Sequence, residues 1–173
     1  YNAYLTAYAK AHFPHEFFTS YLRNAVGKPD TFMEVQELVN NAKIMGINVM
    51  PPSVTKMNEE FKLMGDNPTY GMTNVKGVGS SVFAKMRADM EERGIDPEHC
   101  DWDCFLLLVS PHVNKKAFLN LILSGCFDSF KISRSKMQHQ YSIVKELSKR
   151  EITWLSEYKT DNPEEQVKEC LLK

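Results

Sequence analysis

The chain has 173 residues, of which 43% are hydrophobic and 25% charged, and its net charge is −1. These proportions are typical of a soluble globular protein with one large or two small domains. No apolar run approaches the roughly 20 residues of a membrane-spanning helix, and the first residues lack the pattern of a signal peptide. We therefore expect a cytoplasmic protein without a membrane partner. Because Tyr1 stands inside a helical pattern, we also expect a piece of a longer protein.

The first 70 residues are predicted to be mainly helical. Apolar and aromatic residues recur at helical spacing over residues 2–13, and a proline then begins a second helix over residues 14–26. A third helix is predicted over residues 31–45, ending before a glycine. Residues 47–52 indicate a short strand that two prolines break, and residues 59–75 a small hairpin.

Aromatic residues are concentrated in the first two predicted helices. At helical spacing such residues more often belong to the core, and the alternative is a platform on which nucleic-acid bases stack. We favour the core for the six residues of this set: Tyr1, Tyr4, Tyr8, Phe13, Phe17 and Phe18.

The remaining chain is predicted as helices separated by glycine and proline turns. One helix begins at Ser80, a short one follows Asp101, and a third runs from Asn114 to a stop at Gly125. A long amphipathic helix is expected over residues 133–158, and the residues from Asn162 onward carry another helix start signal. The predicted fold is thus mainly α with a few short strands.

The four cysteines are scattered, which favours a reducing compartment over a disulfide framework. Cys100 and Cys104, with His99 and His112 nearby, raise the question of zinc. Their spacing is not that of a standard finger or ribbon, and no second ligand pair follows. We therefore expect ordinary reduced cysteines and no metal.

A Lys-Gly-Val-Gly turn precedes the helix at Ser80. The first amide groups of a helix have no intrahelical partner and carry the positive end of the helix dipole, so a glycine turn at a helix start can hold a phosphate. The alternative is an ordinary tight turn. We expect a positive φ at Gly79, so that Gly79→Val should weaken binding more than Lys76→Ala. The predicted contacts are Lys76, Gly77, Val78, Gly79, Ser80 and Ser81.

A second glycine turn, at residues 123–129, lies in a basic zone. Residues 110–150 hold eight basic and two acidic residues, a net charge of +6. The zone alone is equally compatible with a solvated helix face, but together with two glycine turns it favours a polyanion partner. The further predicted contacts are Ser124, Gly125, Lys115, Lys116, Lys131, Arg134 and Lys136.

Four segments together resemble one protein family. They are AYLTAYAKAHFPHEFFTSYL (residues 3–22), AKIMGINVMPPSV (42–54), YGMTNVKGVGSSVFAKM (70–86) and VNKKAFLNLILSGCFDSF (113–130). In order and spacing they are similar to the C family of bacterial and phage replicative DNA polymerases, that of the DNA polymerase III alpha subunit. The resemblance implies the later part of the fingers over residues 1–70, a tandem helix-hairpin-helix domain over 71–136, and a helical connector over 137–173.

The resemblance also implies a role for the parent enzyme. That enzyme performs template-directed nucleotidyl transfer with Mg²⁺ ions held by palm aspartates, which would lie before Tyr1. We expect this piece to contain no catalytic residue, to need no cofactor and to be inactive alone, while it binds primer-template duplex beside the remaining polymerase domains. A sliding clamp is a further partner of the parent enzyme. This sequence departs from the family pattern at Ser53, where the family usually has Asp, and at Cys126, where it usually has Ala. The resemblance is weak after Lys136.

Two other functions stay open on the residues alone. One is a free-standing helix-hairpin-helix module of a repair or recombination protein, for which the fingers-like first 50 residues would be unnecessary. The other is a helical docking module whose basic face meets an acidic protein, which salt-dependent DNA binding would distinguish.

Overall fold

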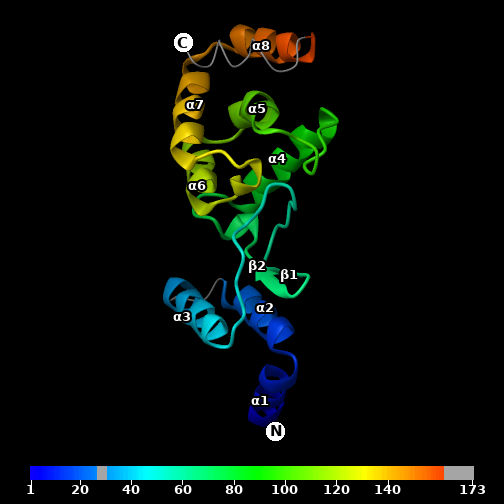
Figure 1. Cartoon of the computed structure of the whole chain (residues 1–173), viewed down its shortest axis with the longest axis vertical. Helices are drawn as coiled ribbons and strands as arrows, with labels where there is room; N and C mark the ends of the chain where they lie inside the picture. Colours follow the sequence, from blue (N-terminus) through cyan, green and yellow to red (C-terminus); the bar gives the residue numbers. More distant parts are fainter. Residues whose placement is uncertain (27–30, 162–173) are drawn as a thin grey trace.

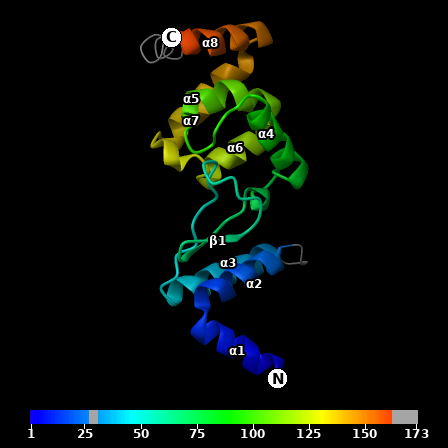
Figure 2. The ribbon, with the colours of Figure 1, turned by 90° about the vertical axis from the view of Figure 1, so that its right-hand side faces the viewer.

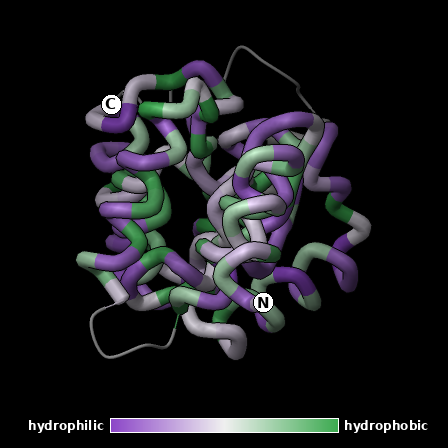
Figure 3. The backbone as a smooth tube through the Cα atoms, turned by 90° about the horizontal axis from the view of Figure 1, so that it is seen from below, coloured by the Kyte–Doolittle hydropathy of each residue, from purple (hydrophilic) through white to green (hydrophobic). Residues whose placement is uncertain are grey.

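The helices are arranged along one long axis in the computed structural model, which describes residues 1–26 and 31–161, with side chains as far as Leu155. Helix α1 (Asn2–His12) lies at one end of this axis and α8 (Lys149–Asp161) at the other (Figures 1 and 2). Seen along the axis, hydrophobic and hydrophilic residues alternate along the helical turns (Figure 3). The predicted mainly helical fold with a few short strands is confirmed.

Two helices and a hairpin form the part of the molecule next to α1. Helix α2 (Pro14–Ala25) begins with its proline in the first turn, as predicted, and packs against α3 (Thr31–Ile44). Strands β1 (Lys62–Met64) and β2 (Asn67–Thr69) pair antiparallel. The strand predicted over residues 47–52 is reduced to one parallel bridge between Met50 and Thr69, because the two prolines that follow donate no ladder hydrogen bonds. Helix α2 ends at Ala25, one residue before its predicted end.

The aromatic residues of α1 are not core residues, contrary to the prediction. Tyr4 is 68% exposed and Tyr8 46%, and no residue of α1 is buried. In α2, by contrast, Phe18 is 1% exposed. The difference follows from position, because α1 lies at the tip of the molecule beside α2, where little of the described chain covers it.

The larger part of the molecule is built on a helical core. A 3₁₀ turn η1 (Met72–Asn74) leads to α4 (Ser80–Glu92). Next comes a continuous helical stretch of α5 (Trp102–Cys104), the π-helix η2 (Phe105–Val109) and the 3₁₀ turn η3 (Ser110–His112). Helix α6 (Lys115–Ser124), the 3₁₀ turn η4 (Asp128–Phe130) and α7 (Arg134–Glu146) complete it.

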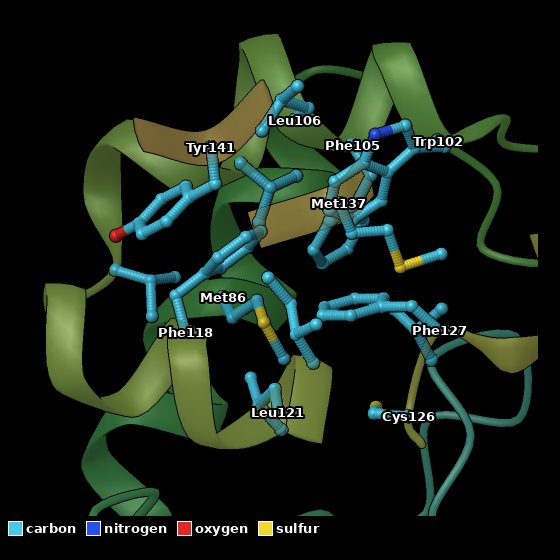
Figure 4. Close-up of a cluster of buried hydrophobic side chains, with 14 of the residues drawn as sticks. Met86, Trp102, Phe105, Leu106, Phe118, Leu121, Cys126, Phe127, Met137 and Tyr141 are labelled. Carbon is cyan, nitrogen blue, oxygen red and sulfur yellow. The ribbon is translucent and has the colours of Figure 1, made fainter. Parts of the chain in front are cut away.

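Aromatic rings fill the centre of this core. Phe105, Phe118 and Phe127 have ring centroids 5.1–6.1 Å apart, and Trp102 and Tyr141 extend the cluster on either side (Figure 4). The Trp102 Nε1–H donates to the Gln140 side-chain oxygen at 2.8 Å, so its polar atom is paired in the core. Helix α7 and Leu155 of α8 belong to the same cluster. Residues beyond 136 are therefore packed with the helices before them.

The long helix predicted over residues 133–158 is two helices, α7 and α8. The Ser148 hydroxyl and backbone N–H both donate to the Glu151 carboxylate, at 2.6 and 2.7 Å, and the Glu151 N–H points back to the Ser148 hydroxyl at 3.4 Å. This is a capping box, which starts a new helix. The sequence carries the S-x-x-E signal of this box at residues 148–151, but the amphipathic pattern that continues through it predicts a single helix. The helix start predicted at Asn162 lies outside the described residues.

Candidate nucleic-acid interface

The Lys-Gly-Val-Gly turn has its left-handed residue at Gly77. Gly77 has φ +85°, a conformation that side chains with a Cβ rarely adopt. Gly79 is the N-cap of α4 and has an extended backbone conformation with φ −83°. The prediction of a positive φ at Gly79 is therefore wrong. Between them, Val78 is 1% exposed and anchors the turn in the core.

The N-terminus of α4 is open to an approaching anion. Its N-cap is a glycine without a side chain to accept from the first amides, and its first turn contains no acidic residue. In α6 and α7, by contrast, the side chains of Asn114 and Ser133 accept hydrogen bonds from Lys116 N–H and Lys136 N–H. A Cβ placed on Gly79 would meet no heavy atom within 4 Å. The first amides of α4 therefore have no side-chain cap, and they stand at the positive end of the helix.

Helix α6 fixes the position of this turn. The Asn120 side-chain amide donates to the Lys76 carbonyl at 2.6 Å, and a Cβ on Gly77 would come within 3.9 Å of the Ala117 Cα. Ser124 lines the same surface depression as Lys76 and Asn120, so the two glycine turns lie near one another. Sequence reasoning missed Asn120, whose only signal is a polar residue within an otherwise apolar helix end.

The second glycine turn ends a helix rather than beginning one. Gly125 has φ +87°, its N–H donates to the Ile122 carbonyl, and the Cys126 N–H donates to the Leu121 carbonyl, both at 3.2 Å. This is the Schellman arrangement, in which both amides satisfy carbonyls of the helix end. They are thus occupied, unlike the first amides of α4.

Arg134, one of the predicted contacts, has partners within the protein. Its guanidinium donates to both carboxylate oxygens of Asp128, at 3.1 and 2.6 Å, and to the Leu123 carbonyl at 2.9 Å. The hydrogen bonds to Asp128 raise the pKa of Arg134 further above its ordinary value. This side chain closes the second turn before α7 begins.

The sequence of this region is similar to that of known proteins. The helix-hairpin-helix motif family matches residues 46–137, just over half of the chain. The chain belongs to the helix-hairpin-helix motif family. It is 35% identical over 128 residues to the DNA polymerase III subunit alpha of Thermus aquaticus, covering 74% of this chain and 10% of that protein.

Two further DNA polymerase III alpha subunits are similar. That of Borreliella burgdorferi is 29% identical over 149 residues, 83% of this chain and 12% of the relative. That of Deinococcus radiodurans is 32% identical over 127 residues, 73% and 9%. The chain thus spans about a tenth of the length of these relatives, and the resemblance to the DNA polymerase III alpha subunit is confirmed.

The basic residues of the helix-hairpin-helix region belong to several elements. Lys115 and Lys116 begin α6, whereas Gly125 follows its end, about 15 Å away at 1.5 Å per residue. Lys131 is exposed and has a positive φ of 56° after η4, and Lys136 is exposed in the first turn of α7. The predicted contacts at these positions stay predictions.

Beside the first hairpin, an ion pair contributes little net charge. Arg23 and Glu60 pair and line the same depression as Gly79 and Ser80. Because Glu60 offsets the charge of Arg23, the positive charge beside the first hairpin comes from Lys76, whose side chain is exposed.

Neither a metal cluster nor a membrane span is found within residues 1–26 and 31–161. No group of three or more His, Cys, Asp or Glu side chains there could hold a metal ion. His99, considered above with the cysteines, pairs with Asp96 through Nδ1 and Oδ2 at 2.6 Å. No helix of this part is long and apolar enough to cross a membrane.

Proposed function

We propose that this chain binds the phosphate backbone of duplex DNA through its first hairpin, as part of a replicative DNA polymerase. The observation that carries the proposal is the uncapped N-terminus of α4: a glycine N-cap, no side-chain hydrogen bond to the first amides and no acidic residue in the first turn. Such a helix start binds phosphate through backbone N–H groups and dipole together, and Lys76 adds a charge. Contacts of this kind position DNA without reading its sequence.

The extent of the similarity favours a polymerase over a free-standing repair module. The family match covers residues 46–137, whereas the polymerase relatives align over 73–83% of the chain. The similarity therefore reaches beyond the helix-hairpin-helix motif.

The parent enzyme would supply the chemistry, and this piece would support the DNA. We expect nucleotidyl transfer with Mg²⁺ to depend on palm aspartates of the parent enzyme, and therefore no primer extension by this piece alone. The other polymerase domains, in the bacterial cytoplasm, would be its neighbours, and a sliding clamp a partner of the whole enzyme.

The test compares bulk added at two places on α4. Gly79→Val places methyl groups in front of the first amides without backbone strain, since φ is −83°, and Ala84→Val adds bulk at an exposed position on the side of the same helix. Fluorescence anisotropy with a labelled duplex should give a wild-type Kd in the range of about 10⁻⁴ to 10⁻⁶ M. Gly79→Val should weaken binding at least about tenfold, because each charge-assisted hydrogen bond that is lost contributes roughly 1.5–3 kcal/mol. Ala84→Val should bind like wild type.

Salt dependence supplies a second readout. Lys76→Ala should lower the log–log salt slope by about 0.9, the value for one phosphate contact, whereas changing the duplex sequence should leave affinity unchanged. If Gly79→Val keeps its circular dichroism spectrum and binds duplex as wild type does, the hairpin is only a structural turn and the proposal is wrong.

A further inference from the structure

The first hairpin contains a β-turn of type II. The Val78 N–H donates to the Val75 carbonyl at 2.9 Å, which closes a four-residue turn with Lys76 and Gly77 at its centre. Gly77 has φ +85°, and Lys76 is not among the residues with a positive φ. A negative φ followed by a positive one is the type II pattern, in which glycine is favoured at the second central position.

Turns of type I and type II differ in the direction of their central peptide. Both forms keep the same ends, but a rotation of the peptide plane between the two central residues exchanges the sides on which its carbonyl and its N–H lie. In a trans peptide these two groups point in opposite directions. Glycine at the second central position has access to both forms, because it accepts either sign of φ. The turn alone therefore does not fix which way the Lys76–Gly77 peptide points.

Asn120 of α6 fixes the direction of this peptide. Its side-chain Nδ2–H donates to the Lys76 carbonyl at 2.6 Å, so the carbonyl points toward Asn120 and the Gly77 N–H points away from it. Val78, which is 1% exposed, anchors the turn in the core independently of this hydrogen bond. Loss of the Asn120 donor would therefore release the peptide plane while the turn stays docked.

The peptide direction decides whether the turn offers a donor or an acceptor on its outer side. Gly77 is exposed, and its N–H has no hydrogen-bond acceptor among the described residues. On the side away from Asn120, the type II form thus presents a free N–H close to the uncapped amides of α4. The type I form would present the Lys76 carbonyl oxygen there instead, and its partial negative charge repels an anion.

We propose that Asn120 is a positioning residue for phosphate binding: it holds the Lys76 carbonyl beside α6 and thereby presents the Gly77 N–H to the DNA backbone. The inference rests on the proposed function and deepens it, because the affinity of the first hairpin then depends on a residue 44 positions away in the chain. Asn120 carries no charge, so its contribution is separable from that of the Lys76 ammonium group.

The first test removes the donor on α6 in the full chain. Asn120→Leu has nearly the same size without donor or charge, and Asn120→Ala removes the donor without adding bulk. Each should bind a labelled duplex about tenfold more weakly than wild type in fluorescence anisotropy, the scale of one hydrogen bond to a charged group. The log–log salt slope should stay at the wild-type value, whereas Lys76→Ala lowers it by about 0.9. Gln138→Leu, the same kind of change at a half-buried amide side chain of α7, should bind like wild type.

Gly77→Ala acts on the same peptide from its other end. A Cβ disfavours the positive φ of the type II form, although Asn120 stays intact. This Cβ would lie 3.7 Å from the Asn120 Nδ2, an ordinary contact, so the effect is conformational. Gly77→Ala should therefore also weaken duplex binding. The double variant with Asn120→Leu should lose less than the product of the two single losses, because both changes release one peptide.

Nuclear magnetic resonance separates positioning from a general loss of structure. The Gly77 amide signal should shift when duplex is added to wild type and stay in place in Asn120→Leu, with both proteins folded by circular dichroism. Wild-type affinity of folded Asn120→Leu and Asn120→Ala would overturn the inference, as would equal shifts of Gly77 in both proteins. A salt slope that falls as in Lys76→Ala would also contradict it, because Asn120 would then act through the lysine side chain. Absence of wild-type binding at low salt would instead contradict the proposed function.

Discussion

Arg134 and Asp128 close the second turn of the helix-hairpin-helix region through two hydrogen bonds between guanidinium and carboxylate, at 3.1 and 2.6 Å. The third bond of the guanidinium, to the Leu123 carbonyl, satisfies a backbone acceptor in the last turn of α6. A residue that looks like a DNA contact from its charge and position thus has a structural task. The two roles predict different consequences of its removal.

We expect Arg134→Gln to lower stability more than DNA binding. Loss of the half-exposed ion pair and the carbonyl bond should reduce the free energy of unfolding by about 1 kcal/mol, seen as a lower urea midpoint. Lys136→Gln, in the same first turn of α7, removes one charge and should leave the midpoint unchanged. Equal midpoints for the two variants would contradict the structural role.

Gly125 combines a left-handed backbone with a crowded site, and Gly46 allows the two effects to be separated. A Cβ at Gly125 would lie 2.7 Å from the Arg134 Nη2 and 2.8 Å from the Asp128 Oδ2, whereas a Cβ at Gly46, with φ +81°, would meet nothing within 4 Å. Gly46→Ala should therefore cost only the left-handed conformation, about 1–2 kcal/mol. Gly125→Ala should cost measurably more in urea denaturation. Equal destabilisation of the two variants would mean that the Arg134–Asp128 pair moves aside for the new Cβ without a further loss in the free energy of unfolding.

Local signals in the sequence predicted local structure correctly. Asp101 accepts from the Cys104 N–H and Asn114 from the Lys116 N–H, each at the helix start where its residue type was expected. The proline at the start of α2 and the glycine at the end of α6 also stand as predicted. These features depend on residues within one helical turn, which a sequence displays directly.

Features that depend on tertiary contact could not be predicted in the same way. The support of the first hairpin by Asn120 joins residues 44 positions apart. The exposure of Tyr4 and Tyr8 depends on what lies beside α1, not on its pattern. Which of two glycines takes the positive φ depends on how the turn docks on α6. The basic zone is one run in the sequence, whereas its lysines are distributed over α6, the residue after η4, and α7.

We expect the thiol of Cys126 to resist alkylation, whereas the other described cysteines are more accessible and should react. It is fully buried, and burial raises its pKa far above the ordinary value for a thiol, so that thiolate is scarce at pH 8. Alkylation of the native protein followed by peptide mass mapping should modify Cys100 and Cys104, which are partly exposed, before Cys126. Modification of Cys126 at the same rate would show that the second turn opens readily.

Substitution of the same residue tests what the site accepts. Cys126→Ala should be tolerated, with a loss of about 1 kcal/mol for the missing sulfur volume. Cys126→Ser should cost more, about 1–3 kcal/mol, because a hydroxyl is buried in an apolar cluster. The comparison is made by thermal denaturation. Equal stability of the two variants would mean that the serine finds a partner in this turn.

The capping box of Ser148 and Glu151 should make the start of α8 sensitive to acid. The hydrogen bonds from the Ser148 hydroxyl and amide hold the pKa of Glu151 below 4.5 in the folded protein. A folded-state pKa below the unfolded value stabilises the protein above about pH 4.5, and this stabilisation is lost as the pH falls through the folded-state pKa. Ser148→Ala should therefore lower the free energy of unfolding measurably at pH 7, because it removes these hydrogen bonds at the helix start. The difference from wild type should narrow at pH 3, because the stabilisation is lost as the pH falls through the folded-state pKa of Glu151. Urea titrations at the two pH values measure this, with Ser135→Ala, an exposed serine of α7, as the control that should show no loss at either pH. A Ser148→Ala deficit of the same size at pH 3 and pH 7 would mean that the hydroxyl stabilises α8 without the Glu151 carboxylate.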